Sequence, residues 1–152
     1  MESTLPTHHQ GNQKEYRALN AYISLLRCSE TVTSDTTRQL AADKLSVGQF
    51  GTLEVLYHLG PLCQRDIGKK LLKTGGNVTT VVANLEKRGL VKRRRMPEDR
   101  RYHSVALTAT GHELIERIMP RQVEKITARM AILSTAEQDE LRRLCRKLGL
   151  GG

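Results

Sequence analysis

Six basic residues crowd into ten positions of the stretch VKRRRMPEDRRYHSVAL, which covers residues 91–107. They are Lys92, Arg93, Arg94, Arg95, Arg100 and Arg101. Ammonium and guanidinium groups bind phosphate oxygens, and a guanidinium also enters a narrow, negatively charged nucleic-acid groove. This stretch therefore favours the binding of a polyanion.

The position of the positive charge along the chain is more informative than its size. The chain carries a net charge of +9, and residues 62–103 hold twelve basic and four acidic side chains, a net of +8. A basic segment in a nearly neutral scaffold is typical of a polyanion-binding module, whereas solubility alone does not require such concentration. Aromatic residues make up only 3% of the chain, which argues against a platform that stacks single-stranded bases.

Residues 77–88 provide a second group of polar side chains. Their apolar residues recur at i, i+3, i+4 and i+7, which predicts a helix that follows Gly75 and Gly76. Small polar side chains on such a helix reach base edges in the major groove, and the helix N-terminus near the two glycines accepts a phosphate. The alternative is an ordinary solvated face. Such a face usually carries acidic residues, whereas residues 77–85 contain none. The polar face comprises Asn77, Thr80, Asn84 and Lys87 or Arg88, with Thr79 and Ala83 beside it.

The elements before this helix are predicted from apolar periodicity and capping signals. A long helix spans about 14–42, and its weak segment TVTSDTT favours a break. Ser46 and Gln49 form a capping-box pattern before a helix that Gly60-Pro61 ends, with an apolar face at positions 47, 50, 53, 56 and 59. A short helix at about 64–72 follows, and its spacing from the next one is that of a helix-turn-helix.

The elements after it form a hairpin and two more helices. Gly89 is expected in the left-handed conformation at the helix end, and two short strands flank the turn MPEDRR. Thr108 caps a helix of more than twenty residues, which Pro120 interrupts and kinks. The pattern STAE at 134–137 is a capping box before the last helix. A helix-turn-helix followed by a basic hairpin predicts a mainly α fold with a small β-wing, a winged helix-turn-helix.

The stretch DRRYHSVALTATG at 99–111 resembles the wing signature of the MarR family of winged-helix regulators, which reads D-x-R, three residues, V-x-L-T-x-x-G. NLEKRGLV resembles the end of the family's recognition helix, and LSTAEQDELRRLCRKL resembles its final helix. The resemblance covers residues 14–148. The residues that match the wing signature are Asp99, Arg101, Val105, Leu107, Thr108 and Gly111.

The resemblance implies a homodimeric regulator, a ligand-responsive repressor that binds double-stranded DNA at a pseudo-palindromic operator. It implies a dimerisation helix at 14–45, a winged-helix DNA-binding domain at 46–108 and C-terminal dimerisation helices at 109–150. Residues 1–13 are expected to form a disordered arm, because they are mostly polar and include Pro6 and Gly11. Small phenolic or aromatic anions release other members from DNA, so an effector of this kind is expected.

The resemblance also assigns roles in the wing. The arginine matching Arg101 enters the minor groove, and the acid matching Asp99 holds it, which a carboxylate two residues away is able to do. Turn formation after Pro97 is the alternative role of Asp99. Strand alternation makes Arg93 and Arg95 one set and Lys92 and Arg94 the other, and the sequence leaves open which set faces DNA. The predicted DNA-binding residues are Gly76, Asn77, Thr79, Thr80, Asn84, Lys87, Arg94, Arg95, Asp99, Arg100 and Arg101.

The three cysteines are widely spaced and odd in number, which is typical of a reduced cytoplasmic protein. Cys63 is predicted at the start of the third helix, where a thiol pKa falls, and Cys28 lies on the first helix; both are redox candidates beside the simpler reading of inert thiols. No secretory signal, membrane-spanning run, metal-ligand spacing, cofactor motif or catalytic motif is present.

Two alternatives to a ligand-responsive repressor remain open. One is a thiol-based redox-sensing regulator, and the other is a non-specific architectural protein that binds nucleic acid through the same basic hairpin. The Asn- and Thr-rich helix face argues against the second. An enzyme is not expected, because no set of residues with catalytic spacing supports one.

Overall fold

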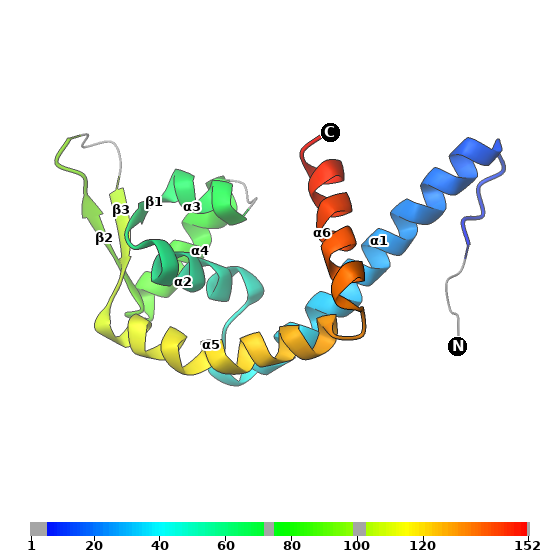
Figure 1. Cartoon of the computed structure of the whole chain (residues 1–152). Coiled ribbons are helices and arrows are strands. Elements are labelled where there is room, and N and C mark those ends of the chain that lie inside the picture. The colour runs from blue at the N-terminus through cyan, green and yellow to red at the C-terminus, as the bar shows by residue number, and fades with distance from the viewer. Residues whose placement is uncertain (1–5, 72–74, 99–102, 152) are drawn as a thin grey trace. The chain divides into compact units, whose positions relative to one another are not determined.

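The computed structural model describes residues 6–71, 75–98 and 103–151 (Figure 1). The chain divides into two compact units, one formed by Gln39–Ala128 and the other by the described residues on either side of that range. The elements are α1 (Gln13–Thr37), a 3₁₀ helix (Arg38–Asp43), α2 (Val47–Leu59), β1 (Leu62–Cys63), α3 (Gln64–Leu71), α4 (Gly75–Lys87), β2 (Val91–Arg95), β3 (His103–Leu107), α5 (Ala109–Met130) and α6 (Thr135–Gly149).

The hydrophobic core lies within Gln39–Ala128. Helices α2, α3 and α4 pack against one another, and α2 and α3 contact β3 while α4 contacts β2. Burial of these apolar side chains is the main source of stability of the unit. The core comprises Leu40, Leu45, Phe50, Leu53, Leu56, Ile67, Val78, Val82, Leu85, Leu90, Val91, Val105, Ile115 and Ile118.

The sheet has three antiparallel strands in the order β1-β3-β2. The predicted hairpin is confirmed, with Val91 opposite Leu107 and Arg95 opposite His103. The prediction of a two-stranded wing was incomplete, because β1 pairs Leu62 with Val105. A strand of two residues is too short to show an alternating pattern, so this partner of β3 has no signal in the sequence.

Local signals set several helix ends as predicted. The Ser46 N–H donates to Gln49 Oε1 at 3.0 Å, and the Gln49 N–H donates to Ser46 Oγ at 3.1 Å, which completes the capping box of α2. Gly60, with φ of 76°, caps the end of α2. In α6, Ser134 Oγ accepts from the Glu137 N–H at 3.2 Å, which is half of the predicted box. Thr108 Oγ1 accepts from the Gly111 N–H at 3.0 Å, at the start of α5.

The first helix lacks the break that the sequence predicts within it. The segment TVTSDTT remains α-helical, and the helix changes to 3₁₀ only at Arg38. The Thr36 hydroxyl donates a hydrogen bond of 2.8 Å to the Val32 carbonyl, and the Thr37 hydroxyl donates one of 2.6 Å to the Thr33 carbonyl. Hydrogen bonding to the preceding turn therefore accommodates these threonines within the helix.

The predicted apolar face of α2 is buried at its centre but not at its ends. Phe50, Leu53 and Leu56 belong to the core, whereas Val47 and Leu59 are exposed. Helix α5 continues through Pro120 as a single helix, so the predicted interruption was wrong.

The fold is mainly helical with a small antiparallel sheet, and its order is that of a winged helix-turn-helix. The boundaries at residues 13, 45 and 108 stay predictions. Among the described residues, no helix is both long and apolar enough to cross a membrane.

Candidate nucleic-acid interface

Helix α4 separates a buried apolar row from an exposed polar surface. Val78, Val82 and Leu85 are almost completely buried in the core. The predicted DNA-binding side chains of this helix are all exposed: Asn77, Thr79, Thr80, Asn84 and Lys87. The same heptad-like spacing that anchors the helix therefore leaves a continuous polar surface on its other side.

The N-terminus of α4 differs from the expectation. The helix begins at Gly75, so Gly75 and Gly76 lie in its first turn instead of preceding it. Two consecutive glycines have low helix propensity, so the sequence predicts a start after them. The first turn contains no acidic residue, and its backbone N–H groups, which have no acceptor within the helix, are suited to an anion.

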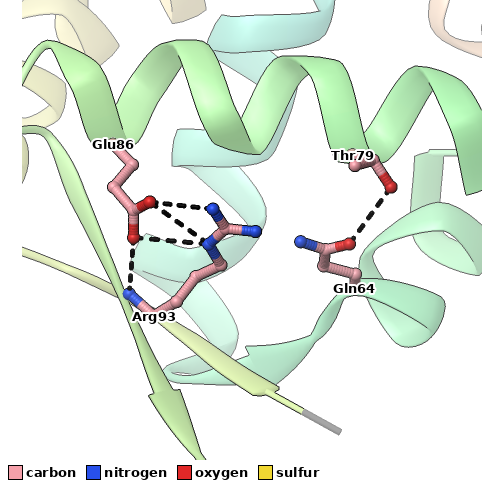
Figure 2. A network of polar contacts seen from close by, with 4 residues as sticks. All are labelled: Gln64, Thr79, Glu86 and Arg93. Atoms are coloured by element: carbon pink, nitrogen blue, oxygen red, sulfur yellow. Dashed lines mark hydrogen bonds and ion pairs between the residues drawn. The ribbon is translucent and has the colours of Figure 1, made fainter.

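Helix α3 contacts the polar surface of α4 through Gln64. The Thr79 hydroxyl donates a hydrogen bond of 3.3 Å to Gln64 Oε1 (Figure 2). Gln64 is the first residue of α3, and sequence reasoning did not identify it, because a glutamine at a helix start carries no distinctive signal. The bond joins the two helices of the helix-turn-helix beside the proposed DNA-reading residues.

The wing strand β2 presents two different faces. Val91 is buried in the core, and the side chain of Arg93 on the same face reaches Glu86 of α4. Lys92 and Arg94 lie on the opposite face, where they line a groove of about 620 Å³ together with Ser104 and Ala106 of β3. Exposed basic side chains at such a groove suit phosphate contacts.

Glu86 and Arg93 form a bidentate ion pair. Arg93 Nη2 donates to Glu86 Oε1 at 2.9 Å, and Arg93 Nε lies 3.2 and 3.3 Å from the two carboxylate oxygens. The Arg93 backbone N–H also donates to Glu86 Oε2, at 3.2 Å. These hydrogen bonds hold the pKa of the Glu86 carboxyl below its usual value and raise the pKa of the Arg93 guanidinium.

The end of α4 is also tied to the segment before α2. Arg88 Nη1 donates to the carbonyl oxygen of Lys44 at 2.7 Å, and Nη2 donates to that of Asp43 at 3.1 Å. The Asp43 carboxylate pairs with Arg117 and Arg121 of α5, at 3.0 and 3.4 Å. Arg88 is therefore engaged within the protein, whereas Lys87 beside it is exposed on the polar surface.

The structure describes two of the five remaining predicted wing residues. Arg94 and Arg95 are exposed near the end of β2. Asp99, Arg100 and Arg101 lie outside the described residues. Their predicted roles at the wing tip stay predictions.

The cysteines and the metal-binding residue types form no compact cluster in the described parts of the chain. Cys63 lies in β1 directly before α3 and is half-buried, and Cys28 is exposed on α1. No disulfide joins the three cysteines. Across residues 6–71, 75–98 and 103–151, no group of three or more His, Cys, Asp or Glu side chains is placed to hold a metal ion.

Comparisons with known proteins place this arrangement among DNA-binding regulators. The model of the MarR family matches residues 45–103, which include α2–α4 and β2. The HTH-type transcriptional regulator YkoM of Bacillus subtilis is 34% identical over 140 residues, which are 91% of each chain.

Two solved structures are similar in sequence and in fold. MepR of S. aureus in complex with DNA is 28% identical, with a TM-score of 0.77 over 86% of this chain and 96% of that one. BpsR of Bordetella bronchiseptica, whose DNA binding is regulated by 6-hydroxynicotinic acid, is 26% identical, with a TM-score of 0.75 over 82% of this chain and 95% of that one.

Proposed function

The chain belongs to the MarR family of DNA-binding transcriptional regulators, and we propose that it is a homodimeric, ligand-responsive repressor that recognises a pseudo-palindromic operator. The observation that carries this proposal is the exposed surface of α4, which combines small polar side chains with an N-terminal turn free of acid, next to a basic wing. We propose no catalytic step. The protein is expected to act in the cytoplasm.

Base recognition is assigned to α4. The side chains of Asn77, Thr80 and Asn84 are short enough for the helix to enter the major groove, and their amide and hydroxyl groups match base-edge donors and acceptors. Thr79 and Lys87 flank this row and are exposed beside it. Gly76 contributes a backbone N–H in the first turn, where an approaching phosphate is favoured by the helix dipole.

Contacts to the DNA backbone and the minor groove are assigned to the wing. Arg94 and Arg95 are exposed on β2, and they and Arg100 provide charge for phosphates. Arg101 would enter the minor groove, and the Asp99 carboxylate would orient its guanidinium group by accepting hydrogen bonds from it. The similarity to MepR, whose structure was solved in complex with DNA, supports DNA binding by this chain.

Dimer formation would cover apolar side chains outside the core. All of α6 is described and none of its residues is buried, although three leucines recur at i, i+3 and i+7. Burial of such a row stabilises an interface by about 25 cal/mol per Å². Two copies would then present two recognition helices to half-sites about one helical turn apart. The exposed apolar residues of α1 and α6 include Tyr16, Tyr22, Leu25, Leu26, Leu141, Leu144 and Leu148.

An aromatic anion is the effector class that we propose. The regulation of BpsR by 6-hydroxynicotinic acid supports this class, because that molecule is a small hydroxylated aromatic acid. Oxidation of Cys63 or Cys28 is the alternative signal, and the half-buried and exposed positions of these thiols leave both within reach of an oxidant.

The test is selection of bound duplexes from a random library with the full chain. We expect one pseudo-palindromic sequence to be enriched, with two chains bound per duplex. Repetition with hydroxylated aromatic acids should release the DNA, whereas release only by hydrogen peroxide would favour the redox alternative. Equal binding of random duplex and of RNA would overturn the proposal in favour of an architectural role.

A further inference from the structure

We propose that Glu86 and Arg93 are positioning residues that hold the wing at a fixed direction relative to the recognition helix α4, so that sequence-specific binding depends on them although neither contacts DNA. The inference rests on the proposed function, in which α4 and the wing read one duplex together. It assigns Arg93 a role different from that of the other basic residues in the same strand.

The position of Glu86 on α4 places its carboxylate against the wing strand β2. Glu86 lies two turns after Thr79, and Figure 2 shows both side chains on the same side of the helix, above Gln64 and Arg93. Thr79 bonds to α3 and Glu86 bonds to β2. One side of the recognition helix is thus attached to the preceding helix near its start and to the wing near its end.

The Glu86 carboxylate binds the backbone of β2 as well as a side chain. β2 is an outer strand of the sheet, so alternate N–H groups face away from β3. The Arg93 N–H is one of them, and it donates to Glu86 Oε2 at 3.2 Å. Because the carboxylate holds both the backbone N–H and the guanidinium of Arg93, it restrains the direction of the strand and not only one flexible side chain.

The connection between α4 and β2 is short and has a defined hydrogen-bond pattern. The Gly89 N–H donates to the Glu86 carbonyl at 2.9 Å, and the Leu90 N–H donates to the Leu85 carbonyl at 3.0 Å. Gly89 has φ of 71°, so these bonds form a Schellman motif, which fixes the turn. Glu86 therefore holds the turn through its carbonyl and the strand through its carboxylate.

The ion pair also neutralises a negative charge beside the DNA-reading surface. An unpaired carboxylate beside a DNA-reading surface would repel phosphates, and its bidentate pairing with Arg93 removes this repulsion. The same pairing leaves Arg93 without a free charge for a phosphate. A phosphate-binding role and a positioning role of Arg93 consequently predict opposite effects of removing Glu86.

The experiment uses the full chain, the selected duplex and a scrambled duplex of equal length. The variants are Glu86→Gln, Arg93→Gln and the exchange Glu86→Arg with Arg93→Glu, which keeps the net charge. Lys92→Gln is the charge-matched comparison, because it removes one charge at the neighbouring position on the other face of β2, where loss of a phosphate contact should weaken binding to both duplexes alike. Affinity for each duplex is measured at several salt concentrations, and circular dichroism and urea unfolding verify that each variant is folded.

A positioning role predicts that Glu86→Gln weakens binding to the selected duplex by about tenfold and leaves or strengthens binding to the scrambled duplex. Arg93→Gln should weaken binding to the selected duplex more than binding to the scrambled duplex, because it releases the wing and also leaves the Glu86 carboxylate unpaired beside the DNA. The exchange should restore part of the lost preference, because it re-forms the side-chain ion pair but not the hydrogen bond from the backbone N–H of residue 93. If a single variant fails to fold, the exchange variant decides, because it retains the pair.

The opposite pattern overturns the inference. If Glu86→Gln strengthens binding to both duplexes, and Arg93→Gln weakens both and lowers the salt slope by about one, Arg93 is a phosphate ligand. Unchanged affinities in both single variants, or an exchange variant that has lost all preference, also overturn it. A wild-type chain that prefers no duplex would instead refute the proposed function, and the two failures are thereby distinguished.

Discussion

Gly111, in the first turn of α5, lies directly against the backbone carbonyl oxygen of Leu90. A Cβ at residue 111 would overlap this oxygen and the carbonyl carbon. The contact belongs to a junction in which the Thr108 hydroxyl donates to the Gly89 carbonyl at 2.6 Å and the Thr108 N–H donates to that of Leu90 at 3.1 Å. The end of the recognition helix, the end of the wing and the start of α5 meet at this point.

We expect Gly111→Ala to destabilise the winged-helix unit. The close neighbour is backbone, which moves only together with the turn after α4, so the added methyl group should lower the free energy of unfolding by about 1–3 kcal/mol. Urea unfolding followed by circular dichroism measures this as a lower midpoint at an unchanged slope.

Gly149→Ala is the matched control for this substitution. A Cβ at Gly149, the last residue of α6, meets nothing within 4 Å. The same chemical change there should be neutral or stabilise the helix by up to about 1 kcal/mol. A loss of equal size in both variants would contradict the steric explanation for Gly111.

Gly111 also illustrates what the sequence is able to predict. Its place in the wing signature was recognised, but the reason for a glycine became visible only with the Leu90 carbonyl beside it. Signals that depend on a few neighbouring residues, such as the Ser46 capping box and the left-handed Gly89, were predicted correctly. The buried row of α4 was predicted for the same reason, since periodicity is a local property.

Features that depend on distant residues were missed. Nothing in the basic run marks Arg93 as the partner of Glu86, because strand alternation groups it with Arg95 without showing what either faces. The contacts of Asp43 with Arg88 and Arg117 join segments that lie far apart in the sequence and carry no pattern. For the candidate site, the sequence therefore predicted which α4 side chains are exposed but not which charges are already paired.

The pair of Glu86 with Arg93 predicts a specific pH dependence of stability. The pKa of Glu86 is lowered in the folded chain, chiefly by its hydrogen bond with Arg93, so ionisation of this carboxyl favours the folded state. Its contribution is complete above the unfolded value of 4.5 and is lost as the pH falls through the lower folded pKa. The difference in unfolding free energy between wild type and Glu86→Gln should thus be constant from neutral pH down to about pH 5 and shrink below it.

Urea unfolding of both proteins across this range checks the prediction. Arg93→Gln should show the same pH dependence, because it removes the other partner of the pair. A difference between wild type and Glu86→Gln that persists unchanged at about pH 2 would show that the carboxylate charge is not its source.

Arg101→Ala should weaken operator binding by about 1–3 kcal/mol per wing, since the guanidinium is proposed to enter the minor groove. Titration of the selected duplex at two salt concentrations measures the loss. Lys14→Ala, an exposed charge at the start of α1, is the control for the removal of one positive charge. Equal affinities of wild type and Arg101→Ala at both salt concentrations would exclude the assigned role of the wing tip.

Base reading by the exposed surface of α4 is tested most directly by the affinity ratio of Asn84→Ala for the selected and scrambled duplexes, with Arg94→Gln measured in parallel. Asn84→Ala should lower this ratio by about five- to one-hundredfold and leave the salt slope unchanged. Arg94→Gln should weaken binding to both duplexes alike and reduce the slope by about one. An Asn84→Ala variant that keeps the wild-type ratio, or that loses affinity equally for both duplexes, would contradict recognition of DNA sequence by this helix.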